Sequence, residues 1–121
     1  MTTHNNGNWT EARFHSFVKG ALRAASNRWP PKYGVKKAAW VRRGVYMCAG
    51  YKHEPHEAVA KDVHVDHIFP VVDPKAGFIS WDELIKRMFV EVEELQVLCT
   101  ECHKSKTADE RADRKCKIDK S

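Results

Sequence analysis

The chain of 121 residues lacks any apolar run long enough to cross a membrane, since no stretch of roughly 18 consecutive apolar residues occurs in it. It also lacks the basic start followed by an apolar stretch that marks a secretory signal. These two absences exclude the transmembrane class and lead us to expect a cytoplasmic protein. Hydrophobic residues still make up 42% of the chain, which is too many for a disordered polypeptide.

Acidic residues are nearly missing from the first third of the chain. Residues 1–47 contain one acid against nine Lys and Arg, whereas residues 48–98 contain ten acids against five Lys and Arg. A basic segment binds polyanions by releasing their counterions, and an acidic segment is suited to holding cations. The pattern therefore favours a nucleic-acid partner for the front of the chain, while a merely solvated basic face has the same composition.

Hydrophobic periodicity and local turn signals predict a mixed α and β chain. Thr10 is expected to cap the first helix, and Ser80 with Glu83 forms a capping box for the third. The expected helices cover residues 10–29, 35–43, 80–89 and 99–111. The expected strands cover residues 45–49 and 63–68, with a loop over residues 50–61, and residues 95–98 form a short apolar stretch. We expect a basic helical extension over residues 1–44, a core over residues 45–111 and a flexible charged tail over residues 112–121.

Cysteine is scarce, and two of the four cysteines are separated by two residues in Cys99-Thr-Glu-Cys102. This spacing lets both thiolates bind one Zn²⁺, and a zinc site needs four ligands. Cys48 is the expected third ligand. His53 is the preferred fourth, with His56 next and Cys116 a weaker alternative. A redox role for the Cys-x-x-Cys pair is disfavoured because the thioredoxin-like strand and helix context is missing.

A second group of polar residues can support hydrolysis. Asp66 and His67 end a predicted strand, and His103 follows the second cysteine of the zinc pair. If the strands and the helix pack together, Asp66 and His103 can converge on one divalent cation such as Mg²⁺ or Mn²⁺. A neutral His67 beside them can take a proton from a water that attacks phosphorus. Such a group predicts metal-assisted phosphodiester hydrolysis.

These residues together resemble the signature of the HNH endonucleases. The resemblance is carried by Asp66-His67-Ile68-x-Pro70 and by Leu95-Gln96-x-Leu98-Cys99-x-x-Cys102-His103-x-x-Lys106-Thr107. Residues 21–32, Ala-Leu-Arg-Ala-Ala-Ser-Asn-Arg-Trp-Pro-Pro-Lys, also resemble the front of small HNH endonucleases of tailed phages. The resemblance implies a ββα-metal core stapled by zinc in an α+β chain, and an enzyme that nicks or cuts DNA. It implies His67 as general base, Asp66 and His103 as ligands of a catalytic Mg²⁺ or Mn²⁺, and the cysteines on a structural zinc.

The chain departs from the HNH signature at two positions. Tyr51 stands where a second early cysteine is usual, so the fourth zinc ligand stays open. Glu94 stands where the middle Asn is expected, with Glu93 as the neighbour if the register slips by one. Glu94 is therefore expected to assist catalysis by accepting a hydrogen bond from His67 or by binding the metal. The alternative is a non-catalytic, zinc-stapled DNA-binding or packaging accessory protein.

The basic front is expected to clamp the backbone of double-stranded DNA without reading its sequence. The resemblance leaves monomer and homodimer open, and it admits the host cytoplasm and the phage packaging machinery as the setting. The residues expected to contact DNA are Arg23, Arg28, Lys36, Lys37, Arg42, Arg43 and Lys106, with Arg13 and Lys19 as further candidates.

Overall fold

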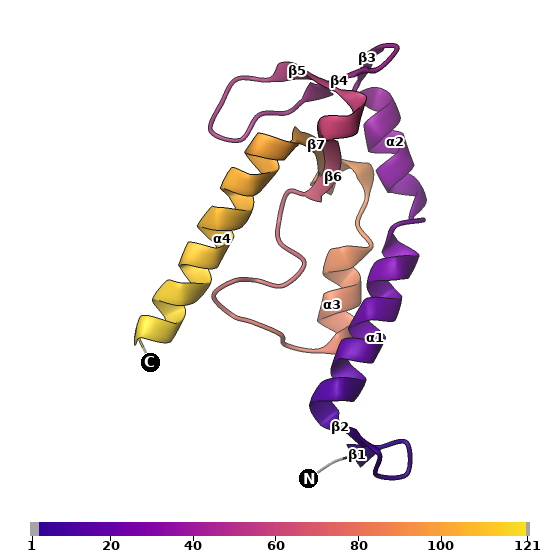
Figure 1. Ribbon diagram of the computed structural model, residues 1–121, viewed down its shortest axis with the longest axis vertical. Coiled ribbons are helices and arrows are strands. Elements are labelled where there is room, and N and C mark those ends of the chain that lie inside the picture. The colour runs from indigo at the N-terminus through magenta and orange to yellow at the C-terminus, as the bar shows by residue number, and fades with distance from the viewer. Residues whose placement is uncertain (1–2, 121) are drawn as a thin grey trace.

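The computed structural model describes residues 3–120, with the side chains of residues 4–113. Four α-helices and three small antiparallel sheets occur in this part of the chain, so the predicted α+β class is confirmed. The helices α1 and α4 are the longest elements and lie on opposite sides of the shorter helix α3 (Figure 1). No helix among the described residues is long and apolar enough to pass through a bilayer.

The N-terminal third forms a small hairpin followed by two helices. Strands β1 (Thr3–His4) and β2 (Trp9–Thr10) pair with each other and lead directly into α1 (Glu11–Ser26). The expected cap is present, because the Thr10 hydroxyl accepts a hydrogen bond from the Arg13 backbone N–H at 3.2 Å. A free N–H at a helix start is stabilised in this way.

Helix α2 begins and ends earlier than the sequence suggested. It covers Pro30–Ala38, whereas residues 35–43 were expected to be helical. The two prolines that stop α1 also start α2, since a proline in the first turn needs no N–H donor and already has the helical φ. The chain then turns into strand β3 (Trp40–Arg42). Gly44, with φ +79°, lies in the turn after β3 rather than at a helix end.

The second sheet contains a strand that the sequence did not predict. Strand β4 (Val45–Cys48) lies between β3 and β5 (His56–Val59). Residues 50–61 were expected to be a loop, and this was wrong for β5. The segment is rich in His and Glu, which hid its pairing with β4, in which Cys48 lies opposite His56.

A hairpin followed by a helix forms the centre of the molecule. Strand β6 (Val63–His67) pairs antiparallel with β7 (Leu95–Cys99), and the short helical turns η1 (Ala60–Asp62) and η2 (Val92–Glu94) precede them. The pairing runs from Val63 opposite Cys99 to His67 opposite Leu95. Helix α4 (Thr100–Lys120) follows β7 without a break. The buried core residues described on β7 are Leu95, Val97 and Leu98.

The two remaining helices differ in how well the sequence predicted them. Helix α3 covers Trp81–Met88, and the Ser80 hydroxyl accepts from the Glu83 N–H at 3.1 Å, so the capping box is confirmed. Leu84 and Met88 are buried as expected, but Ile85 is 42% exposed. Helix α4 continues to Lys120, past the expected end near residue 111. The backbone of residues 112–120 is therefore helical, and Ser121 lies outside the described residues.

Candidate functional site

Three cysteines and one histidine converge where β4, β5, β7 and α4 meet. The ligand atoms of Cys48, His56, Cys99 and Cys102 all lie within 4.8 Å of one another. A tetrahedral Zn²⁺ with Zn–S distances of about 2.3 Å holds its ligand atoms a little under 4 Å apart, so a small contraction completes such a site. Three thiolates and one imidazole are also a ligand set that zinc accepts. This group can therefore hold a metal ion such as zinc.

The local fold orients the Cys48 thiol before any metal arrives. Its Sγ accepts hydrogen bonds from the backbone N–H groups of Gly50 at 3.4 Å and of Cys99 at 3.2 Å. Gly50 has φ +83°, and a Cβ there would lie 2.3 Å from the carbonyl oxygen of His53. Only glycine fits this turn. The turn thus returns the chain so that β5 brings His56 opposite Cys48.

The fourth donor is His56 and not the preferred His53. The register of β4 and β5 decides this, because His56 is the residue paired with Cys48. The ring centroid of His53 lies 6.4 Å from that of His56, and His53 is not part of the four-residue group. Cys116, the weaker alternative, has its side chain outside the described residues.

Tyr51, at the position of the usual cysteine, connects its loop to α4. Its hydroxyl donates to Asp109 Oδ2 at 2.5 Å, and the same oxygen lies 2.7 Å from Lys52 Nζ. The hydrogen bond to Asp109 raises the pKa of Tyr51 to about 12. Lys52 and Tyr51 in turn lower the pKa of Asp109. This contact holds the loop beside the cysteine group.

The thiols of Cys99, at the end of β7, and of Cys102, in the first turn of α4, differ in acidity. Burial raises the pKa of Cys99, but hydrogen bonds from the Cys102 backbone and from His56 outweigh it and bring the pKa to about 7. Burial raises the pKa of Cys102 to about 11, and its contacts with the other two thiols add to this. A hydrogen bond to the Glu54 carbonyl and contact with Cys99 raise the pKa of His56. Of these two thiols, Cys99 therefore ionises first.

Asp66, His67 and His103 line one surface cleft of about 830 Å³. Asp66 Oδ1 lies 3.7 Å from His103 Nε2, so β6 and α4 bring these two side chains together. Asp66 Oδ2 accepts from Gln96 Nε2 at 3.0 Å, because Gln96 is its partner across the β6–β7 pair. Gln96 was not predicted to contribute to the site, because its position opposite Asp66 follows from the register of β6 and β7.

The imidazole of His67 has a fixed orientation. Its Nε2 lies 2.7 Å from the backbone carbonyl oxygen of Met88. A carbonyl can only accept, so Nε2 carries the proton in this contact. When His67 is neutral, Nδ1 is therefore the nitrogen with a free lone pair.

Lys106 lies inside the cleft wall and is only 7% exposed. Its Nζ lies 3.1 Å from Asp66 Oδ2 and 2.9 Å from Glu110 Oε2, and it donates to the His67 carbonyl oxygen at 2.8 Å. A lysine engaged in this way is not displayed toward DNA as the sequence suggested. It balances the charge of two carboxylates instead. Glu110, one turn further along α4, was not anticipated.

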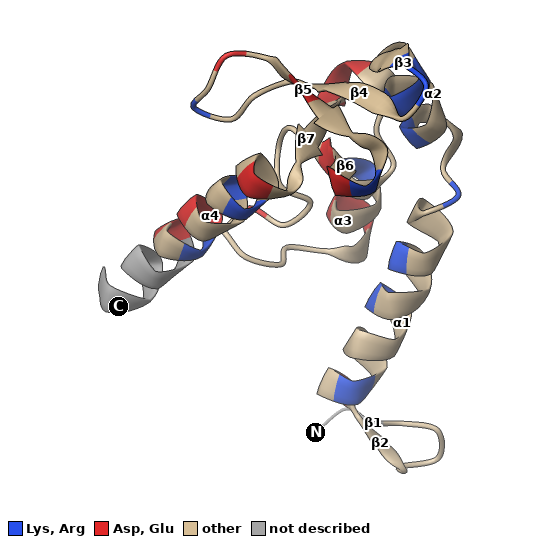
Figure 2. Cartoon of the chain, turned by 45° about the horizontal axis from the view of Figure 1, so that its top comes forward, with Lys and Arg blue, Asp and Glu red and all other residues tan. Residues whose placement is uncertain are grey.

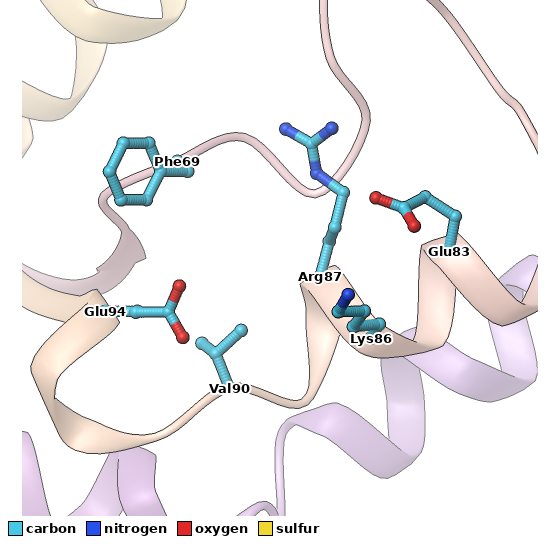
Figure 3. A pocket seen from close by; sticks show the side chains of 6 residues that line it. All are labelled: Phe69, Glu83, Lys86, Arg87, Val90 and Glu94. Carbon is cyan, nitrogen blue, oxygen red and sulfur yellow. The ribbon is translucent and has the colours of Figure 1, made fainter.

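Glu94 lies away from this cleft. Its carboxylate lines a separate pocket of about 300 Å³ with Phe69, Glu83, Lys86, Arg87 and Val90 (Figure 3). The contact of residue 94 with β6 is made by its backbone, whose carbonyl accepts from the Ile68 N–H at 3.0 Å. The expected hydrogen bond between the Glu94 carboxylate and His67 is not formed between these two described side chains. The His67 ring bonds instead to the Met88 carbonyl. Glu93, the neighbouring alternative, is exposed.

Basic side chains from the N-terminal helices reach the cleft of Asp66. Lys19 and Arg23 of α1 and Lys32 of α2 line it together with His67 and His103. Basic residues follow one another along α1 in Figure 2. Lys32 donates to Ser26 at 2.5 Å, and burial lowers its pKa.

The other predicted DNA contacts lie elsewhere. Arg28 and Lys36 line a neighbouring hollow that also contains His64. Arg42 is engaged by Glu57 through two hydrogen bonds of 2.8 and 3.2 Å. Lys37 and Arg43 are exposed. The cleft therefore gathers part of the predicted basic set, and Lys32 is a member that the prediction omitted.

Comparison of the chain with family models, with curated proteins and with solved structures finds no match.

Proposed function

We propose that this chain is a metal-dependent DNA endonuclease of the HNH kind, in which His67 acts as the general base. The observation that carries the proposal is the composition of one cleft. Asp66, His67 and His103 lie in it beside Lys19 and Arg23 of a separate helix. Cutting a nucleic-acid backbone requires both a hydrolytic group and a surface that binds phosphate. Candidates for both line this one cleft.

His67 is suited to accept a proton. The Met88 carbonyl holds its Nε2–H, so the lone pair on Nδ1 is available to a water molecule. Because the backbone fixes the ring, little reorganisation is needed before the proton moves. The water oxygen would then attack phosphorus, and the bond to the leaving 3′-oxygen would break.

Asp66 and His103 would hold the divalent ion. A carboxylate and an imidazole 3.7 Å apart are donors that Mg²⁺ or Mn²⁺ accepts while it keeps water in its other positions. When bound, such an ion supplies charge stabilisation to the phosphate and to the leaving oxygen. Gln96 holds the Asp66 carboxylate from the neighbouring strand, which restricts its rotation. The cysteine group would serve as a structural zinc site next to this cleft.

The basic helix supplies the binding surface. Lys19 and Arg23 are four residues apart on α1, so they lie on the same side of the helix and both reach the cleft. Cationic side chains at this spacing can contact the phosphates that flank a cleavage point, and such contacts position a duplex without reading its sequence. Double-stranded DNA is therefore the substrate class that we propose.

Cleavage of supercoiled plasmid tests the proposal. The purified chain should convert the plasmid to the open-circle or linear form only when Mg²⁺ or Mn²⁺ is added. His67→Ala should abolish conversion while it retains DNA binding, because the base is removed and the basic helix is intact. His53→Ala is the matched control and should cut normally. Equal cutting by His67→Ala and the parent chain would remove His67 from the reaction.

A second candidate function is a zinc-stapled DNA-binding module without catalysis. Lys106 favours it, since its ammonium group already lies 3.1 Å from the carboxylate that would hold the catalytic ion. The position of Glu94 outside the cleft favours it as well. This candidate predicts salt-sensitive retardation of plasmid DNA and no conversion with any divalent ion.

A further inference from the structure

A second pocket lies beside the segment that follows His67, and it shares no lining residue with the cleft that contains Asp66. It has a volume of about 300 Å³ and is lined by Phe69, Glu83, Lys86, Arg87, Val90 and Glu94. Figure 3 shows the ring of Phe69 on one side and the side chain of Arg87 on the other, with the Glu94 carboxylate below the ring and next to Val90. These residues belong neither to the cysteine group nor to the lining of the cleft that contains Asp66.

Phe69 is exposed although its backbone is firmly held. The ring is 63% exposed. The residue before it donates its N–H to the Glu94 carbonyl at 3.0 Å, and the Pro70 carbonyl after it accepts from Arg87 Nε at 3.0 Å. A large apolar side chain that is fixed in this way and left in water is suited to stacking against a flat ligand.

The charged side chains of the pocket do not pair with one another, although Arg87 Nε donates to the Pro70 carbonyl. Four of them line it, two acids and two bases. No ion pair or side-chain hydrogen bond joins any two of these four described side chains. The pocket thus offers carboxylate acceptors, cationic donors and an aromatic face within one small volume. These are the groups that read the edge and the face of an unpaired nucleobase.

The position of the pocket relates it to the cleft. Phe69 follows His67 by two residues, which span at most about 7 Å of extended chain. Successive stacked nucleotides of one strand are about 3.4 Å apart. A base one or two nucleotides from a phosphate in the cleft can therefore reach Phe69 if it leaves the duplex.

We infer that this pocket binds an unpaired nucleobase of the DNA strand in the cleft, stacked on Phe69 and hydrogen-bonded to Glu94. A carboxylate accepts from the exocyclic amino group of cytosine, whereas thymine has a carbonyl oxygen at that position and its one ring N–H lies between two carbonyl oxygens that repel a carboxylate. The chain should consequently prefer an unpaired cytosine to an unpaired thymine at the cleavage point. The inference depends on the proposed function for the placement of DNA, but not on cutting.

Binding to bulged DNA tests the inference. Fluorescence anisotropy would compare a fully paired duplex with the same duplex carrying one unpaired cytosine or one unpaired thymine, with no divalent ion added to the purified chain. The parent chain should bind the cytosine bulge most tightly. Phe69→Ala should weaken binding to the bulge about fivefold or more, since stacking contributes about 1 kcal/mol or more per base, and should leave the paired duplex unaffected. Glu94→Ala should remove the difference between cytosine and thymine.

The control is Phe17→Ala, because Phe17 is similarly exposed at 57% but lies on α1 and does not line the pocket. It should keep the preference for the bulge. Equal affinity of the parent chain for paired and bulged DNA, or a preference that survives in Phe69→Ala, would overturn the inference. A bulge preference in a chain that never cuts plasmid would refute the nuclease and retain the pocket. Cutting of plasmid without any preference for bulged DNA would retain the nuclease and refute the nucleobase pocket.

Discussion

Each of the four residues of the cysteine group contributes one ligand atom for a metal ion. Cys48 is fully buried and Cys102 is 2% exposed, so an ion held between them is shielded from water. His56 closes the group from β5 and lies 3.5 Å from Cys99 Sγ. Because ligands and fold are coupled in such small sites, a missing donor should weaken both metal binding and folding.

We expect His56→Ala to lower zinc affinity at least tenfold, since even residues behind the ligands cost that much when they are removed. His53→Ala, three residues earlier, should leave zinc affinity unchanged. Competition with a chromophoric chelator measures both variants. A larger loss in His53→Ala than in His56→Ala would contradict the ligand set described here.

Lys106 compensates two carboxylates, and its removal should be costly. Lys106→Met leaves Asp66 and Glu110 facing each other without the ammonium group between them. We expect a loss of about 3 kcal/mol in the free energy of unfolding, at the low end of the range known for breaking a buried ion pair by removing one partner. Urea denaturation measures it. An unchanged midpoint would show that the carboxylates do not need this lysine.

At the scale of elements, contacts between distant segments place the site. The loop after β4 is attached to α4 through Tyr51 and Asp109, and β5 is attached to β4 by register. The sequence predicted the helix caps at Thr10 and Ser80 because a cap depends on residues three apart. Its preference for His53 over His56 was wrong, because that choice depends on how many residues the turn at Gly50 contains. The strand β5 was missed because its segment is rich in His and Glu, which hid the pairing with β4.

Tyr51→Phe should reveal a pH-dependent contact. The pKa of Tyr51 rises from its ordinary value of 10.0 to about 12 in the folded chain, so folding holds the phenol proton more tightly. This contribution to stability is complete below pH 10 and is lost as the pH rises toward 12. The parent chain should melt a few degrees above Tyr51→Phe at neutral pH, and the difference should shrink above pH 10. A difference that stays constant to pH 12 would exclude the hydrogen bond as its cause.

The basic side of α1 should contribute to the salt dependence of DNA binding. Arg23 lines the cleft, whereas Arg13 lies over the Trp9 ring at 4.6 Å near the start of the same helix. Arg23→Ala should therefore reduce the slope of log K against log salt by about 0.9, the value of one phosphate contact. Arg13→Ala, with the same loss of charge, should change the slope less. Equal effects would indicate general attraction rather than a contact in the cleft.

Over the whole molecule, segments far apart in sequence combine into one site. The strand with Asp66 and His67, the helix with His103 and the front helix with Arg23 all border the same cleft. Charge composition indicated the basic front, but only the placement of α1 and α2 along the cleft selects Lys19, Arg23 and Lys32 from the larger basic set. For Glu94 the sequence was misleading. Its position in the HNH-like motif predicted a place beside His67, but its side chain lines another pocket.

Chemical rescue of a His67 variant tests directly whether His67 is the general base. His67→Gly leaves space for a free imidazole beside Met88, and cleavage of a labelled duplex would be followed in Mn²⁺ with and without added imidazole. We predict that His67→Gly is inactive and that imidazole restores cutting, while Asp66→Ala stays inactive under both conditions. Cutting by His67→Gly without imidazole, at the rate of the parent chain, would contradict a general base at this position.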